Sequence, residues 1–188
     1  EKQGQSQIEA LKVLSDLAVV RENQELLAST ELGLLRTLVE VVREDKGEER
    51  AQALLLLWYL ASEEKNKGPM ATIAELGLLG LLVEVVGEEK GQSRVTALGI
   101  LAHLALAAEN QILMVTSTEL GLLPLLMGVV REGKGDARIQ SLATLGYLAA
   151  APENREPMAA AELGLVAVLT EVINEDKGSA RDNALVTL

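Results

Sequence analysis

The sequence predicts an all-α protein, a solenoid of repeated three-helix units. A Glu-Leu-Gly-Leu-Leu motif at residues 31–35 returns, with small changes, at residues 75–79, 119–123 and 162–166. A charged loop that ends in glycine returns with it, at residues 44–47, 88–91, 132–135 and 175–178, and a longer apolar stretch follows each loop. A fixed period of 43 or 44 residues is typical of solenoids, in which each unit buries its apolar face on its neighbours.

The first period justifies each element in turn. Over residues 5–19, apolar side chains recur at three- and four-residue spacing, which predicts a long amphipathic helix. A short helix is expected over residues 22–30, and then Gly33 allows a sharp turn that a side chain would hinder. A second helix is expected over residues 34–42, and after the loop a new long helix over residues 48–62.

Two residue types support these boundaries. An asparagine recurs near each short helix, as Asn23, Asn66, Asn110 and Asn154, where we expect it or its neighbour to cap exposed amides. Prolines are expected within about the first turn of a short or second helix, where a missing amide donor costs little: Pro69, Pro124 and Pro157.

The period also predicts the domain organisation, a single solenoid over residues 1–188. It comprises a lone third helix, three full repeats and a truncated repeat: 1–20, 21–62, 63–107, 108–151 and 152–188. Neither end shows the polar outer face of a capping repeat. The simplest interpretation is a fragment of a longer array, and self-association through the open ends is the alternative.

Composition excludes several classes of function. Seventeen basic and 28 acidic residues give a net charge of -11, which repels phosphate and anionic lipid, so neither nucleic acid nor a membrane is an expected partner. The chain has no cysteine and begins without a signal-peptide pattern, so we expect a cytoplasmic or nuclear protein. The aromatic residues are only Trp58, Tyr59 and Tyr147, so the core is expected to consist of Leu, Val, Ile and Ala.

The repeat resembles the armadillo repeat, in which a glycine separates a short helix from the second helix. The match is carried by ASTELGLLRTLVEVV at residues 28–42 and QALLLLWYLA at residues 52–61. HEAT repeats are the close competitor, but they are generally two-helix units without this glycine. The armadillo resemblance implies a right-handed superhelix whose third helices line a concave groove for extended protein segments.

The peptide-binding members of that family carry a ladder of asparagines on their third helices, typically four residues after a tryptophan. Here the asparagine position holds Asp16, Tyr59, His103 and Tyr147, and the tryptophan position holds Lys12, Leu55, Gly99 and Ala143. The chain departs from the pattern at every rung. The ladder therefore does not carry over, nor does importin-type recognition of basic localisation signals.

The residues in this register predict a different binding face. The only histidine and both tyrosines lie 44 residues apart, so Tyr59, His103 and Tyr147 would form a row of flat side chains with hydrogen-bonding tips. Trp58 and Asp16 would lie nearby, and small residues would leave hollows between the rungs: Gly99, Ala102, Ala143 and Gly146. The alternative is that the row, and Trp58 above all, only packs one repeat against the next.

We therefore expect a protein interaction module that binds an extended protein or peptide segment on its concave face. The negative charge would steer a basic segment toward it. No enzyme activity, metal site or cofactor is expected, because His103 has no second histidine, cysteine or nucleophile in its register. The alternative is a structural spacer or self-assembling scaffold with no dedicated peptide site.

Overall fold

In the computed structural model of the chain, every element of secondary structure in the described residues is helical. Those residues are 2–73, 77–132, 134–160, 163–175 and 179–187. The helices form two compact units, residues 1–104 and residues 105–188. Each unit is described by itself below.

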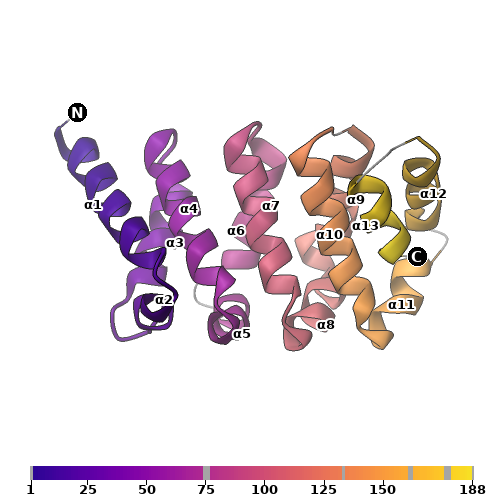
Figure 1. Cartoon of the computed structure of the whole chain (residues 1–188), viewed down its shortest axis with the longest axis horizontal. Helices are drawn as coiled ribbons and strands as arrows, with labels where there is room; N and C mark the ends of the chain where they lie inside the picture. The colour runs from indigo at the N-terminus through magenta and orange to yellow at the C-terminus, as the bar shows by residue number, and fades with distance from the viewer. Residues whose placement is uncertain (1, 74–76, 133, 161–162, 176–178, 188) are drawn as a thin grey trace. The chain divides into compact units, whose positions relative to one another are not determined.

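The first unit contains seven helices in the described residues. They are α1 (Lys2–Ala18), α2 (Arg21–Leu27), α3 (Leu34–Glu44), α4 (Glu48–Ser62), α5 (Glu64–Thr72), α6 (Leu78–Glu88) and α7 (Gln92–Ala105), whose last residue falls in the second unit. The long helices α1, α4 and α7 form one layer, α3 and α6 lie behind it, and α2 and α5 lie across its lower end (Figure 1). Each three-helix unit thus contributes one long helix to the front layer.

The second unit repeats this arrangement. It contains α8 (Ala108–Thr116), a 3₁₀ turn (Thr118–Leu120), α9 (Leu122–Glu132), α10 (Asp136–Ala150), α11 (Pro152–Ala159), α12 (Leu165–Glu175) and α13 (Ser179–Thr187). Helices α10 and α13 pack side by side, and α9 and α12 pack behind them (Figure 1). The expected loops at residues 132–135 and 175–178 lie partly outside the described residues, as do Glu75 and Glu162 of the repeated motif.

The helix boundaries follow the sequence closely. The long helix expected over residues 48–62 is α4 at those same bounds, and α3 extends the expected second helix by two residues. The glycine of the motif adopts the left-handed conformation before the second helix in all four copies: Gly33, Gly77, Gly121 and Gly164, with φ of 57–70°. Few residues other than glycine adopt that φ without strain, so the motif sets where each second helix begins.

Two expectations, one about the prolines of the short helices and one about the core, are wrong. Pro69 and Pro157 lie inside α5 and α11, beyond the first turn, because both helices begin immediately after the preceding long helix. Both prolines are exposed, so water can solvate the carbonyl that each leaves without an amide partner. The core also contains more than the expected aliphatic residues, because methionine is buried with them: Met70, Met114, Met127 and Met158.

The recurring asparagines do not cap the short helices. In the first unit, Asn66 Nδ2 donates to the carbonyl of Leu60 at 2.9 Å, at the end of α4, and to the carbonyl of Gln24 at 3.0 Å, in the preceding short helix. Asn66 is buried, and no side chain caps α5. The amide hydrogens of Asn66 face backbone carbonyls that have no amide partner within their own helix. The side chain therefore donates to these carbonyls and does not accept a hydrogen bond at the start of α5.

The second unit contains the same link. Asn154 Nδ2 donates to the carbonyl of Leu148 at 2.8 Å and to the carbonyl of Gln111 at 2.9 Å, and Asn154 is 1% exposed. Gln111 Nε2 in turn donates to the carbonyl of Ala105 at 3.1 Å. A buried amide therefore joins successive short helices in each unit.

A second inter-repeat link lies at the other end of the long helices, near their first residues. The Arg50 side chain, 5% exposed, donates through Nη1 to Glu89 Oε1 at 2.8 Å and through Nε to the carbonyl of Asp45 at 3.0 Å. In the same way, Gln7 on the preceding long helix, α1, donates through Nε2 to Asp45 Oδ2 at 3.1 Å. The acidic loops are therefore more than solvated turns, because Asp45 and Glu89 accept hydrogen bonds from the preceding repeat.

No single helix in the described residues is both long and apolar enough to cross a membrane. Within the part of the chain that the structure describes, only the consecutive helices α7 and α8, taken together, reach the length and composition of a span, and they do so by those two measures alone.

Replacing Asn66 by alanine tests the buried link. We expect Asn66→Ala to lower the free energy of unfolding by about 2–4 kcal/mol, because two hydrogen bonds are lost and two carbonyls stay buried without them. Asn23→Ala is the matched control, since Asn23 makes one such bond, to the carbonyl of Leu17, at an exposed site. Urea unfolding followed by circular dichroism measures both. Equal losses in the two variants would contradict the assigned role.

Candidate functional site

The residues of the expected row lie on the long helices of the two units. Asp16 on α1 is exposed, and Tyr59 on α4 and His103 on α7 are half-buried. Trp58, beside Tyr59, is also half-buried. Tyr147 on α10, in the second unit, is 37% exposed. None of these side chains is fully buried, so each is available to a ligand in part.

Three rings meet in the first unit. The Trp58 ring lies 5.3 Å from the Tyr59 ring, with 69° between their planes, and 5.4 Å from the His103 ring, with 66° between the planes. Both are edge-to-face geometries, the favoured arrangement of aromatic pairs. Trp58 therefore joins α4 to α7 and links the two rungs of the row. Asp16 has no hydrogen bond or ion pair to these rings in the part of the chain that the structure describes.

The hollow expected at Gly99 is absent, because Trp58 fills it. A Cβ atom added to Gly99 would lie 3.0 Å from Trp58 Nε1 and 3.2 Å from Trp58 Cδ1. The glycine therefore admits the indole against the backbone of α7. Ala102 is buried, 6% exposed. In the second unit, Ala143 and Gly146 line a small cavity of about 50 Å³ beside Tyr147.

Burial shapes the electrostatic environment of His103, together with a lysine that the sequence did not point to. Burial lowers the pKa of the imidazole below its usual 6.5, and the positive charge of Lys67 lowers it further. Lys67 lies on α5, is 4% exposed and pairs with Glu64. Its register on the short helices holds Gln24, Gln111 and Arg155, so no repeated pattern singles it out. His103 is therefore biased toward its neutral form, which both donates and accepts hydrogen bonds.

The site offers little to a metal ion. Among the described residues, no three side chains of His, Cys, Asp or Glu gather where they could hold one. The three rings instead form a partly exposed aromatic patch with a neutral imidazole at one edge. Such a patch suits apolar, stacking and hydrogen-bonded contacts.

Substitution at Gly99 tests whether Trp58 is packed against α7. Gly128 is the matched control, because it lies inside α9 with no atom within 4 Å of an added Cβ. We expect Gly128→Ala to raise the free energy of unfolding by about 1 kcal/mol. Gly99→Ala should gain less, or lose stability, because the indole must move. Trp58 is the only tryptophan, so its fluorescence should change in Gly99→Ala alone; equal gains with unchanged emission would contradict the packing.

The lowered pKa of His103 predicts a pH dependence. The unfolded chain binds the imidazole proton near pH 6.5, and the folded chain binds it only at lower pH. The stability contributed by neutral His103 is therefore complete above pH 6.5 and lost as the pH falls toward the folded pKa. Urea unfolding between about pH 7.5 and about pH 5.5 should show a steeper loss in the parent than in His103→Gln. Parallel curves would show that the pKa is not lowered.

No protein-family model and no curated protein matches the chain. The solved structures with similar folds include several designed or engineered proteins. One is a designed armadillo repeat protein, with a TM-score of 0.80 over 96% of this chain and 73% of its own, at 20% identity. A structure of computationally designed armadillo repeat proteins for modular peptide recognition has a TM-score of 0.81, over 100% of this chain and 75% of its own, at 21% identity. A designed armadillo repeat protein in complex with the peptide (KR)4 has a TM-score of 0.82, over 95% of this chain and 72% of its own, at 20% identity. The chain therefore has the armadillo repeat fold, an all-α array of three-helix units.

Proposed function

We propose that the chain is a non-enzymatic interaction module that binds an extended peptide segment across α1, α4 and α7. The observation that carries the proposal is the contact of three half-exposed rings, Trp58, Tyr59 and His103, on two neighbouring long helices. Buried core packing would hide such rings, and a solvated face would hold charged residues in their place. The fold supports the proposal because similar designed structures are described as made for peptide recognition.

The mechanism uses the regular spacing of the rungs. Tyr59 and His103 occupy the position from which other armadillo proteins grip a peptide backbone with asparagine, and both can donate and accept hydrogen bonds. Trp58 lies between them and supplies apolar area at little cost in side-chain entropy. Tyr147 holds the same register position in the second unit, and Asp16 holds it on α1. Each rung would add a modest increment to the affinity.

A basic segment suits the charge of the protein. The net charge of -11 attracts cations at low salt, and exposed Asp16 supplies a carboxylate in the register of the rings. Lysine and arginine side chains also bind the faces of tryptophan and tyrosine. Lys67 does not oppose this directly, because it is buried and paired with Glu64. A structural spacer with no peptide site is the competing function, and the experiment below separates the two.

Titration of the peptide (KR)4 tests the proposal, with a serine-glycine peptide of equal length as the uncharged probe. We expect saturable binding of (KR)4, a change in Trp58 fluorescence and an affinity that falls with salt. Tyr59→Ala should weaken binding roughly tenfold, and His103→Ala should weaken it less. Because a basic probe also binds loosely to any acidic surface, the fluorescence change is the decisive measurement.

The matched control is Glu40→Gln, which removes an exposed carboxylate from α3, behind the layer of long helices. It should lower the affinity only slightly, through the net charge. Equal losses in Glu40→Gln and Tyr59→Ala would mean nonspecific charge attraction. Absence of saturable binding to (KR)4, together with no enrichment from a library of extended peptides, would leave the spacer function.

A further inference from the structure

A second row of side chains runs beside the rings of the first unit. Gln52 lies on α4 two helical turns before Tyr59, and Thr96 lies on α7 two turns before His103. All four side chains are half-buried. Positions two turns apart share one face of a helix, so each of these helices presents a polar side chain and a ring on the same face. Gln52 and Thr96 are called the polar row below, and Tyr59 and His103 the ring row.

The polar row has hydrogen-bonding capacity that the fold does not use. In the described residues, the carboxamide of Gln52 makes no hydrogen bond. Thr96 Oγ1 donates to the carbonyl of Gln92 at 3.0 Å, which leaves its oxygen able to accept. On α1 the same register holds Glu9, whose carboxylate is paired with Lys12 at 3.5 Å. The uncharged, available groups therefore lie on α4 and α7.

The strip between the two rows is apolar. Leu55 on α4 is half-buried, Gly99 on α7 is buried, and Trp58 fills the space over Gly99. None of the three is ionised, so a peptide backbone that lies on this strip strips no charged group of its water. Two helical turns correspond to about 10 Å along the helix axis, so the two rows stand on either side of a strip wide enough for one extended chain.

An extended peptide matches this arrangement. Its successive side chains point to opposite sides of the backbone, so a peptide that crosses α4 and α7 over Leu55 and Gly99 directs alternate side chains to the two rows. We propose that the binding face selects an alternating peptide, with basic side chains over the ring row and uncharged hydrogen-bonding side chains over Gln52 and Thr96. This inference rests on the proposed function, because it assigns the specificity of the same face.

The chemistry of a carboxamide decides which side chains suit the polar row. Gln52 donates and accepts hydrogen bonds without carrying a charge, so an asparagine, glutamine, serine or threonine of the peptide can pair with it. An apolar side chain would remove water from the carboxamide and leave its hydrogen bonds unmade. An acidic side chain could bond to the amide, but the net charge of -11 opposes its approach.

The second unit carries the same chemistry at the same register. Gln140 lies on α10 two turns before Tyr147, and its carboxamide makes no hydrogen bond in the described residues. Asn183 holds this register on α13 and donates to the carbonyl of Ile139 at 3.3 Å. An uncharged polar side chain therefore stands in this register on α4, α7, α10 and α13.

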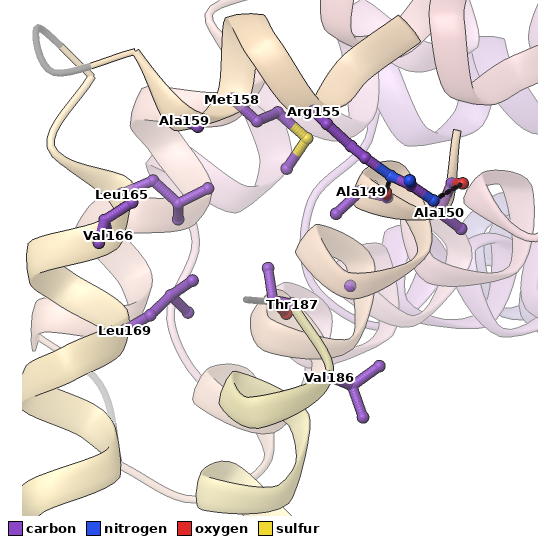
Figure 2. Close-up of a pocket in the computed structure, with 11 residues that line it drawn as sticks. Ala149, Ala150, Arg155, Met158, Ala159, Leu165, Val166, Leu169, Val186 and Thr187 are labelled. Atoms are coloured by element: carbon purple, nitrogen blue, oxygen red, sulfur yellow. Dashed lines mark hydrogen bonds between the residues drawn. The ribbon is translucent and has the colours of Figure 1, made fainter. Parts of the chain in front are cut away.

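The cavity of about 470 Å³ in the second unit has a different character. Apolar side chains of α11 and α12 line most of it. Figure 2 shows the guanidinium of Arg155 turned toward the carbonyls of Ala149 and Ala150, to which it donates at 3.4 Å each. Thr187 donates to the carbonyl of Asn183 at 2.8 Å. Its polar side chains are thus bonded to the backbone of their own unit, whereas the carboxamide of Gln52 is not.

Titration with the peptides (KN)4 and (KL)4, followed by the fluorescence of Trp58, tests the inference. The two peptides have equal length and charge, and asparagine and leucine have nearly the same shape, so attraction by net charge cancels in the comparison. The peptide (KR)4 does not make this distinction, because arginine also donates to a carboxamide. The parent should bind (KN)4 about fivefold to tenfold more tightly than (KL)4. Added salt should weaken both and leave the ratio unchanged.

The double variant Gln52→Met, Thr96→Val removes the hydrogen-bonding groups of the polar row at nearly constant size. It should bind the two peptides with affinities within about twofold of each other. Thr37→Val is the matched control, because exposed Thr37 lies on α3, behind the long helices, and donates to a carbonyl four residues earlier, as Thr96 does. It should keep the preference of the parent. Circular dichroism confirms that each variant folds.

The outcomes separate this inference from the proposed function. If (KR)4 binds saturably and changes the fluorescence of Trp58, but (KN)4 and (KL)4 bind equally, the inference is wrong and the proposed function stands. A preference for (KN)4 that survives in the double variant, or that Thr37→Val removes equally well, would also overturn the inference. If none of the three peptides changes the fluorescence of Trp58, the proposed function and the inference fail together.

Discussion

A buried asparagine shared between two backbone carbonyls is the constraint on which this array depends. Asn66 satisfies a carbonyl at the end of α4 and a carbonyl of α2, so a single amide group fixes where the long helix ends and where the preceding short helix lies. Asn154 does the same in the second unit. The donors lie 42 and 43 residues from the carbonyls of the preceding repeat. An insertion within a repeat would move the amide out of reach, which gives a physical reason for the steady period of the sequence.

The fold could be predicted from the sequence because its signals are local and periodic. Apolar spacing marks the long helices, and Gly33 with its equivalents marks the start of each second helix. The role of the asparagines could not be predicted in the same way. An asparagine near a helix start has the same sequence signature whether its oxygen caps that helix or its nitrogen binds the helix before. Which of the two roles the asparagine takes depends on which backbone carbonyls the fold brings close to it. For Asn66, the side-chain amide donates to the carbonyl of Leu60 at the end of the preceding helix.

The candidate site was partly predictable, for a related reason. Register alone places Tyr59 and His103 on neighbouring rungs, since long helices repeat at the period of the sequence. It does not say that Trp58 lies against Gly99, because that contact depends on the direction of one side chain between two helices. Nor does it reveal Lys67, because the same register position holds Gln24, Gln111 and Arg155 in the other repeats. The sequence therefore located the rings, but not the contacts that close the hollow and lower the pKa of His103.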